Sequence, residues 1–200
     1  LLKKIKDSSN HNDGEIQECV DSITRQVSEI GLLVDEFSNF ARLPNPEFDD
    51  FDICSILLKC INDVKSNYDN IAFNLSGVDE KFILSCDKNQ ITRVFQNIII
   101  NSINSINESA NNNFDGNITF NTNLEENKFI IRISDNGSGL KYDKDELIKP
   151  YFTTRKKTGG TGLGLSIVEK ILFDHNADFE ITNRNDGHKG AIASIYFNSK

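Results

Sequence analysis

Several features that mark other classes of protein are missing from this sequence of 200 residues. Lysine and arginine number 22 against 30 aspartates and glutamates, which gives a formal net charge of −8. Binding to a nucleic-acid backbone needs clustered basic side chains, so we expect no nucleic-acid partner. No apolar run approaches the roughly 20 residues that cross a bilayer, and no charged-then-apolar signal segment opens the chain. We therefore expect a soluble, cytoplasmic fragment that makes no membrane contact.

The four cysteines, at positions 19, 54, 60 and 86, show no CxxC spacing and have no histidine nearby. This pattern gives little support to a zinc site or a disulfide framework, and it favours reduced thiols in a cytosolic protein. A hydrophobic content of 38% is enough for one core and a helical appendage. The chain also starts without methionine. We expect a longer parent protein, whose upstream part could be anchored in the inner membrane.

Apolar residues spaced alternately four and three apart predict a long helix in the first part of the chain. The seam consists of Ile16, Val20, Ile23, Val27, Ile30, Val34, Phe37 and Ala41. Pro44 and Pro46 end the pattern. A buried aliphatic side chain contributes roughly 1.5–3 kcal/mol, so a seam of this length needs a partner helix. We expect residues 1–45 to be part of a helical bundle, completed by a second copy as a homodimer. The alternative is a lone helix lying on the following domain.

Residues 46–200 show mixed helix and strand patterns. Helices are predicted near residues 52–66, 87–106 and 162–175, the second with Asp87 as its N-cap. Strands are predicted near residues 71–75, 81–86, 117–124 and 127–134. A closing hairpin is predicted from 179–182 and 191–197 around Asp186-Gly187, and the segment before residue 161 is predicted to be loose.

Two glycine clusters predict a nucleotide site. The sequence Asp135-Asn136-Gly137-Ser138-Gly139 follows the strand-like run 129–133, and Gly160-Thr161-Gly162-Leu163-Gly164-Leu165 opens an amphipathic stretch. Glycine permits close backbone approach. A helix N-terminus offers unpaired N–H groups and partial positive charge to phosphate. Each cluster alone could serve only a turn.

Asn97 and Asn101 lie one helical turn apart, so both amides project from one face of a helix that is otherwise rich in isoleucine. Polar groups in such a stripe are costly unless they have partners. An amide oxygen suits Mg²⁺, and Asn101 is the candidate metal ligand. The alternative is a pair of exposed helix asparagines in an Asn-rich protein.

Four motifs resemble the N, G1, F and G2 boxes of the sensor histidine kinase ATP-binding domain. In chain order they are Asn97–Ser102, Asp135–Gly139, Pro150–Thr154 and Gly160–Leu165. Residues 26–44 are similar to the second helix of that family's dimerisation and phosphotransfer bundle, most like the nitrogen-regulation (NtrY-like) branch. The resemblance implies a GHKL-type α/β two-layer sandwich over residues 46–200. In this fold helices cover one face of a mixed sheet, here preceded by a long dimerisation helix whose own partner helix is truncated.

The resemblance also implies a role for each matching residue, with ATP and Mg²⁺ as ligands. Asp135 accepts a hydrogen bond from the adenine amino group, and Asn101 holds Mg²⁺ with the catalytic Asn97 beside it. Gly137 and Gly139 let the loop approach the base and ribose. The phosphate region comprises Thr154, Arg155, catalytic Lys156, Lys157, Gly160, Thr161, Gly162, Leu163 and Gly164. The basic residues of this set could instead form a solvated loop, and Leu163 helps to seat the following helix.

Two departures from the family pattern matter. Ser102 stands where the family usually has alanine. None of the three histidines, His11, His175 and His188, has the sequence context of a phosphoacceptor, and all three are interpreted as ordinary surface residues. We expect the acceptor histidine upstream of Leu1. The fragment should therefore bind ATP but not phosphorylate itself.

The resemblance implies a kinase that passes the γ-phosphoryl group to histidine and then to a response regulator. The alternatives are a GHKL-type ATPase and an ATP-sensing dimerisation module. ATPases of this fold carry glutamate, which activates water, four residues before the metal asparagine. That position here is Asn97, whose amide cannot act as a base.

Overall fold

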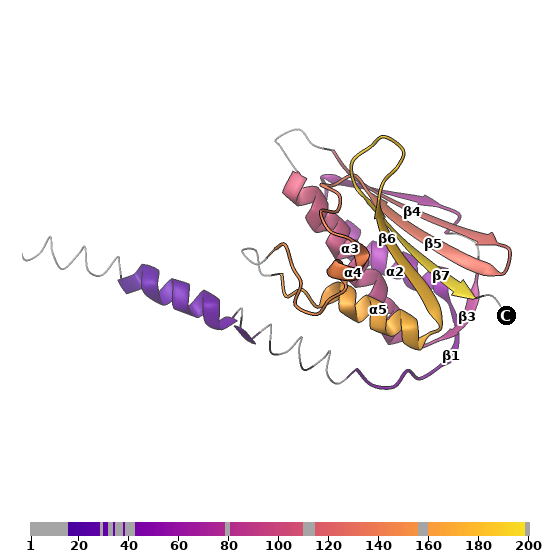
Figure 1. Cartoon of the computed structure of the whole chain (residues 1–200), viewed down its shortest axis with the longest axis horizontal. Coiled ribbons are helices and arrows are strands. Elements are labelled where there is room, and N and C mark those ends of the chain that lie inside the picture. Colours follow the sequence, from indigo (N-terminus) through magenta and orange to yellow (C-terminus); the bar gives the residue numbers. More distant parts are fainter. Residues whose placement is uncertain are drawn as a thin grey trace, which may run out of the picture. The chain divides into compact units, whose positions relative to one another are not determined.

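The computed structural model describes residues 16–28, 30–31, 34, 38, 43–78, 81–109, 115–155 and 160–198. The chain forms two compact units, one of residues 1–43 with 155–161 and the other of residues 44–154 with 162–200. The sheets and the labelled helices in Figure 1 belong to the second unit.

The second unit contains a five-stranded mixed sheet of order β2-β4-β5-β7-β6. These strands are β2 (Ile71–Ser76), β4 (Gly116–Glu125), β5 (Lys128–Asp135), β7 (Ala191–Asn198) and β6 (Ala177–Asn183). β2 runs parallel to β4, and the other neighbours are antiparallel. A smaller antiparallel sheet pairs β1 (Asp49–Asp52) with β3 (Ile83–Cys86). The helices are α2 (Ile53–Lys65), α3 (Lys88–Ser109), α4 (Lys144–Leu147) and α5 (Gly164–Asp174).

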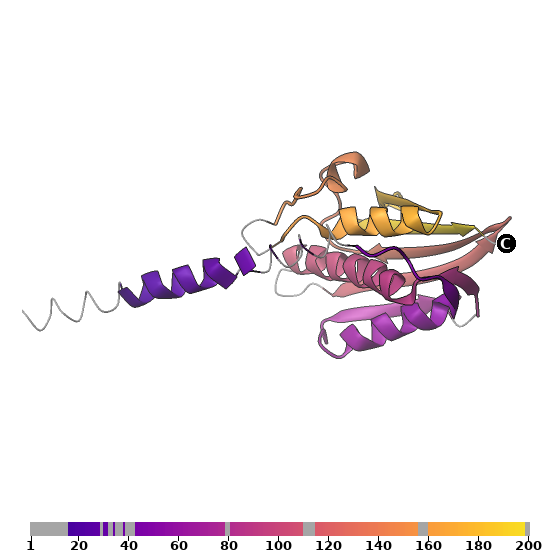
Figure 2. The same ribbon diagram turned by 90° about the horizontal axis from the view of Figure 1, so that it is seen from below.

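The three longer helices cover one face of the large sheet, as the two views in Figures 1 and 2 show. α3 packs between α2 and α5 and against β4 and β5. Its buried stripe follows the helical period: Ile91, Val94, Phe95, Ile98, Ile99, Ile103 and Ile106. β4 meets this stripe with alternate residues buried, among them Ile118 and Phe120. The predicted two-layer α/β sandwich is confirmed.

The predicted elements of this unit are confirmed, with two additions. α4 interrupts the segment that was expected to be loose. One turn is too short to show helical periodicity, although its acidic residues Asp145 and Glu146 suit a helix N-terminus. β1 was also not predicted, because its four residues are mostly polar and it is defined by pairing with β3.

Asp87 is the N-cap of α3, as predicted. Its Oδ1 accepts the backbone N–H groups of Asn89 (2.9 Å) and Gln90 (3.0 Å). Its Oδ2 accepts the N–H of Glu47, at 3.0 Å. One carboxylate therefore satisfies two of the unpaired N–H groups at the start of the helix and also holds the segment before β1.

His175 joins the end of α5 to the start of α3. Its Nε2 accepts the backbone N–H of Asp87 at 2.9 Å, so Nδ1 carries the proton and donates to the carbonyl of Ile171 at 2.7 Å. The ring also lies 5.1 Å from the Phe48 ring, between centroids. The interpretation of His175 as an ordinary surface histidine is wrong, because the side chain is half-buried and has two bonding partners. His188 is exposed, and His11 lies outside the described residues.

Residues 16–28, 30, 31, 34 and 38 are helical. The long dimerisation helix over this part of the chain stays a prediction. Six seam residues, from Ile16 to Val34, are 48–62% exposed, so this apolar stripe has no cover within the described chain. Phe37, Ala41 and the first 15 residues lie outside the described part. None of the described helices has both the length and the apolar character of a membrane span.

None of the four cysteines, all of which lie in the described part of the chain, forms a disulfide, and three of them belong to the core. Cys54, Cys60 and Cys86 are buried, whereas Cys19 is exposed. Burial raises the pKa of Cys60 to about 11 and that of Cys86 also to about 11. These two thiols are therefore protonated at neutral pH and act as small apolar groups.

Replacing Asp87 with alanine should lower the free energy of unfolding by about 1 kcal/mol, because α3 loses its N-cap. Burial opposes the charge of Asp87, but the hydrogen bonds from Glu47, Gln90 and Asn89 outweigh it and hold the pKa below the ordinary value. A depressed pKa means that this stability is present above about pH 3.9 and is lost as the pH falls through the folded-state pKa. Urea unfolding of both proteins at pH 7 and at pH 2.5 measures the difference.

Asp87→Asn is the matched control, because it keeps an oxygen that can accept the N–H groups of the first turn. It should retain most of the stability at neutral pH. An alanine variant that unfolds at the same urea concentration as the unaltered chain would contradict the capping role.

Candidate nucleotide site

The carboxylate of Asp135 is buried at the end of β5. Hydrophobic residues on both sides of this strand place it in the sheet core, and Asp135 is only 4% exposed. Its Oδ1 accepts the backbone N–H of Gly137 at 2.9 Å and that of Ala191 at 3.3 Å. The Ser102 side chain, which is buried on α3, supplies a further hydrogen bond.

Burial raises the pKa of Asp135 above its ordinary value. The hydrogen bonds from Gly137, Ala191 and Ser102, together with the positive charge of Arg184, act in the opposite direction. A buried carboxylate held in this way is a strong hydrogen-bond acceptor for a ligand that brings an N–H donor.

The glycine loop after Asp135 lies directly on α3. A Cβ added to Gly137 would overlap Ser105 and would lie 2.8 Å from the backbone nitrogen of Ile106. The next residue, Ser138, donates its N–H to Ser105 Oγ at 3.1 Å. Gly137 therefore has to be glycine for a steric reason, since its backbone dihedral φ is not positive.

The other end of the loop is held by β6. Asn183 accepts the Leu140 N–H at 2.6 Å and donates to the Leu140 carbonyl at 3.0 Å. Gly139 has φ +76°, and an added Cβ would lie 2.7 Å from Asn183 Oδ1. The loop that carries Gly137 and Gly139 is thus fixed on two sides by α3 and β6.

The asparagine pair of α3 faces the start of α5. A Cβ added to Gly164 would lie 2.9 Å from Asn97 Oδ1 and 3.9 Å from Asn101 Nδ2. Asn97 donates its amide nitrogen to the Arg93 carbonyl at 2.8 Å, which leaves its oxygen facing Gly164. Asn101 is exposed, and no hydrogen bond of its side chain exists within the described residues. The structure therefore brings together three predicted site residues from two distant motifs.

The N-terminus of α5 has no side-chain cap, and Leu163 at the N-cap position is fully buried. The Leu163 side chain therefore anchors the helix in the core, as the sequence suggested. Gly162 has φ +73° and packs against the backbone of Tyr151 and Phe152, and its carbonyl accepts the Tyr151 N–H at 3.0 Å. The backbone N–H groups at this helix end, with their partial positive charge, suit a phosphate.

The phosphate-side residues are described only in part. Thr154 is exposed, and the Gly160 N–H donates to the Arg155 carbonyl at 3.0 Å. Lys156 and Lys157 lie outside the described residues. Arg155, Gly160 and Thr161 belong to the first compact unit, and their role at the phosphates stays a prediction.

Three residues that hold the site were not predicted from the sequence. Ser102 was noted only as a change from the usual alanine, yet its side chain bonds to Asp135. Arg184, on the β6–β7 connection, and Ala191, the first residue of β7, also contact Asp135. Ala191 donates a backbone N–H, which any residue except proline could supply, so the sequence does not mark it. In the sequence, Arg184 and Asp186 look like ordinary charged residues beside a turn.

Residues 86–200 match the family described as histidine kinase-, DNA gyrase B- and HSP90-like ATPases. This match covers more than half of the chain, and the chain belongs to this family. The nitrogen regulation protein NtrY of Azorhizobium caulinodans is 35% identical over 178 residues, which cover 88% of this chain and 23% of NtrY. The resemblance to NtrY-like sensor histidine kinases is thereby confirmed, and the chain spans about a quarter of that relative's length.

Solved histidine kinase structures share the fold. The catalytic domain of the histidine kinase ThkA superposes with a TM-score of 0.65 at 23% identity, over 76% of this chain and 96% of that chain. ThkA in complex with the response regulator protein TrrA gives a TM-score of 0.69 at 20% identity, over 89% of this chain and 49% of that chain. At this level of identity the likeness establishes the GHKL-type fold.

Proposed function

We propose that this chain is the ATP-binding catalytic part of a two-component sensor histidine kinase. It would transfer the γ-phosphoryl group of ATP to a histidine upstream of Leu1, from which a response regulator receives it. Residues 46–200 would be the catalytic domain, and residues 1–45 part of the dimerisation and phosphotransfer region, in the cytoplasm. The observation that supports this proposal most is that Asn97 and Asn101 of α3 face Gly164 at the start of α5. Ser102, the residue after Asn101, bonds to Asp135.

Asp135 is the proposed adenine acceptor. The 6-amino group of adenine is a donor, and an ionised carboxylate is the strongest acceptor that a protein can offer it. Both backbone N–H bonds of Asp135 fall on Oδ1. Gly137 and Gly139 keep the loop free of side chains beside this position, so that a base and a ribose can approach.

Asn101 and Ser102 are consecutive on α3, so the metal end and the adenine end of the site are set by one rigid helix. The exposed amide of Asn101 fits Mg²⁺, which prefers oxygen ligands and shares them with phosphates. The ion would neutralise phosphate charge during transfer. No cluster of three acidic, histidine or cysteine side chains that could hold a metal occurs among the described residues, which suits an ion that arrives with ATP.

The triphosphate would extend from Asn101 toward the N-terminus of α5. Gly162, Leu163 and Gly164 would offer backbone N–H groups there. Thr154, Arg155, Lys156, Lys157, Gly160 and Thr161 would contribute to phosphate binding, where the basic side chains would offset phosphate charge and Lys156 would act in catalysis. Transfer of a phosphoryl group depends mainly on positioning and charge neutralisation, which these groups supply.

Asn97 favours a kinase over a hydrolase. Its amide nitrogen is engaged by the Arg93 carbonyl, and its oxygen faces Gly164. An amide does not take a proton from water at neutral pH, so the site lacks a base at the position where ATPases of this fold carry glutamate. An imidazole acceptor is a nucleophile without such help.

Two partners follow from the proposal. The uncovered apolar seam of the first helix supports a homodimer, because a stripe that is 48–62% exposed would be buried in a bundle with a second copy. ThkA, which shares the fold, has been solved in complex with a response regulator protein. This supports a response regulator as the phosphoryl acceptor of the parent kinase.

Asp135→Asn should weaken ATP binding by about 10- to 100-fold, because a hydrogen bond to a charged group contributes roughly 1.5–3 kcal/mol. The asparagine amide would also present donors toward the adenine amino group. Titration calorimetry with Mg²⁺ and ATP measures the affinity. Asp143→Asn is the matched control, since Asp143 precedes α4 and makes no side-chain capping bond. Equal affinities of Asp135→Asn and the unaltered chain would remove the adenine assignment.

Asn101→Ala should abolish the part of the ATP affinity that depends on Mg²⁺. We expect the unaltered chain to bind ATP more tightly with Mg²⁺ than with a chelator, and the variant to bind equally in both conditions. Asn107→Ala is the control, because Asn107 is an exposed asparagine further along α3. A variant that keeps the full Mg²⁺ dependence would show that another group holds the ion.

The phosphoryl acceptor is tested with a longer form of the chain that includes the proposed histidine upstream of Leu1. Incubation with γ-labelled ATP should give a label on the protein that is lost in acid and kept in base, as expected for phosphohistidine. The 200-residue chain alone should remain unlabelled. A label stable in acid would point to a hydroxyl acceptor, and rapid release of free phosphate without labelled protein would favour the ATPase alternative.

A further inference from the structure

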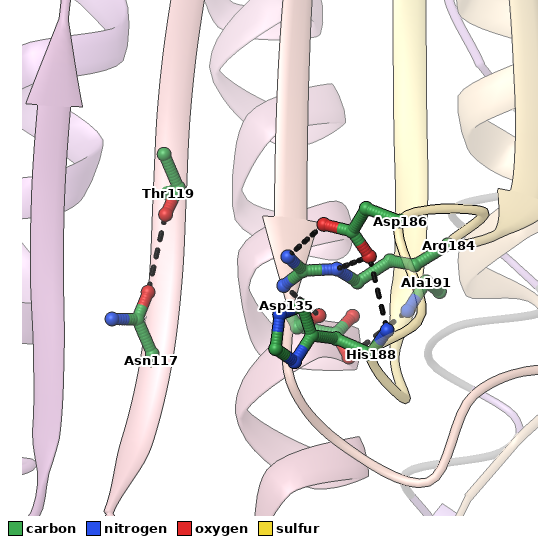
Figure 3. Close-up of polar contacts among 7 residues, drawn as sticks. All are labelled: Asn117, Thr119, Asp135, Arg184, Asp186, His188 and Ala191. Carbon is green, nitrogen blue, oxygen red and sulfur yellow. Dashed lines mark hydrogen bonds and ion pairs between the residues drawn. The ribbon is translucent and has the colours of Figure 1, made fainter.

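The connection between β6 and β7, residues 184–190, lies against the end of β5 that carries Asp135. Figure 3 shows Arg184, Asp186, His188 and Ala191 gathered around this residue. The Arg184 guanidinium donates from Nη1 to the Asp135 carbonyl oxygen at 3.3 Å. Ala191, where β7 begins, donates its N–H to the Asp135 carboxylate at 3.3 Å. The connection therefore holds the backbone of Asp135, and the first residue of β7 holds its side chain.

The guanidinium is itself fixed by Asp186. Arg184 Nε donates to Asp186 Oδ1 at 3.2 Å, and Nη2 donates to Oδ2 at 2.5 Å. Asp186 Oδ1 also accepts the His188 N–H at 3.2 Å, within the turn of the hairpin. A fork of two parallel bonds orients the guanidinium plane, which a lysine cannot reproduce. The Arg184 side chain is 20% exposed and that of Asp186 is 48% exposed, so the fork geometry rather than burial restrains this pair.

Close packing joins the connection to Asp135. Gly190 is buried with φ +127°, and a Cβ added there would overlap the Asp135 carbonyl and lie 3.0 Å from the Asn136 Cα. Its own carbonyl accepts the Arg184 N–H at 3.0 Å. A shift of the connection would therefore displace Asp135, because there is no free space between them.

From this geometry we propose that Arg184 is a positioning residue for the adenine-reading carboxylate. Fixed by Asp186, it would hold Asp135 in the place from which one carboxylate oxygen meets the 6-amino group of a purine. This inference rests on the proposed function, and it assigns to Arg184 and Asp186 a part in base selection.

The positive charge of Arg184 also lowers the pKa of Asp135 and so favours its ionised form. Burial raises the pKa of Asp135, and Arg184 provides the favourable opposite charge that faces it. Asp186 faces Arg184 from the exposed side, so it orients the guanidinium but also reduces its net charge. The pair therefore contributes mainly through the position of Asp135.

The distinguishing measurement is selection between two nucleotides, ATP and purine riboside triphosphate, which has hydrogen in place of the 6-amino group. The unaltered chain should prefer ATP by about 10- to 100-fold, the value of a hydrogen bond to a charged acceptor. In Arg184→Gln this ratio should fall to within about threefold, because a displaced Asp135 no longer meets the amino group. Binding of the purine analogue should change little.

Arg132→Gln is the matched control. Arg132 lies on the same strand as Asp135, is also half-buried, and bonds to Asn123 and Glu125 instead. The control removes the same charge from the chain and should leave the ratio unchanged. Arg184→Lys should restore only part of the selection, because it keeps the charge without the fork. Asp186→Asn should lower the ratio in the same direction as Arg184→Gln while leaving the arginine in place.

Each outcome decides between specific claims. If Arg184→Gln weakens both nucleotides equally, or keeps the full ratio, Arg184 has only a structural role or none, and the inference is wrong. Should Arg184→Gln fail to fold, the ratio of Asp186→Asn decides in the same way. If the unaltered chain binds both nucleotides equally, the adenine assignment of Asp135 fails and the inference fails with it. Loss of selection in Asp135→Asn and Arg184→Gln, with the Arg132→Gln control intact, supports both.

Discussion

The burial of one carboxylate, that of Asp135, sets the arrangement of the whole site. An ionised group that is 4% exposed needs hydrogen bonds to remain charged in the interior. These bonds come from three segments that are far apart in sequence: Ser102 on α3, Gly137 in the glycine loop and Ala191 at the start of β7. The hydrogen bonds to this single carboxylate therefore hold the glycine loop, α3 and the closing hairpin together at one place.

The two faces of α3 have different roles, one in the core and one at the candidate site. Isoleucines and Phe95 form its buried stripe against the sheet, while Asn97, Asn101 and Ser102 lie toward the candidate site. Because the core stripe fixes the rotation of the helix about its axis, it also fixes where the polar residues point. The start of the helix is set by the Asp87 cap and by the bond from Asp87 to His175. Packing and capping thus supply the precision that a nucleotide site requires.

Features with a local cause could be predicted from the sequence. The stripe of α3 repeats with the helical period, Asp87 has the side chain of an N-cap, and Asp186-Gly187 marks a turn; the structure confirms all three. Features that depend on distant partners could not be predicted. The half-buried His175 has no sequence signal, because its acceptor role depends on the start of another helix. Arg184 looks like an ordinary surface charge until the fold places the Asp135 carbonyl beside it.

The chemistry of Asn97 also depends on contacts that the sequence does not show. The sequence shows that position 97 is an amide, but only the fold shows that its nitrogen is bound to Arg93 and its oxygen faces Gly164. An amide whose nitrogen is bound to the backbone can orient neighbouring groups but cannot accept a proton from water. In the proposed function, the site holds the triphosphate and spreads its charge but does not activate a nucleophile. The proposed acceptor therefore has to be a nucleophile without help from the site, as an imidazole is.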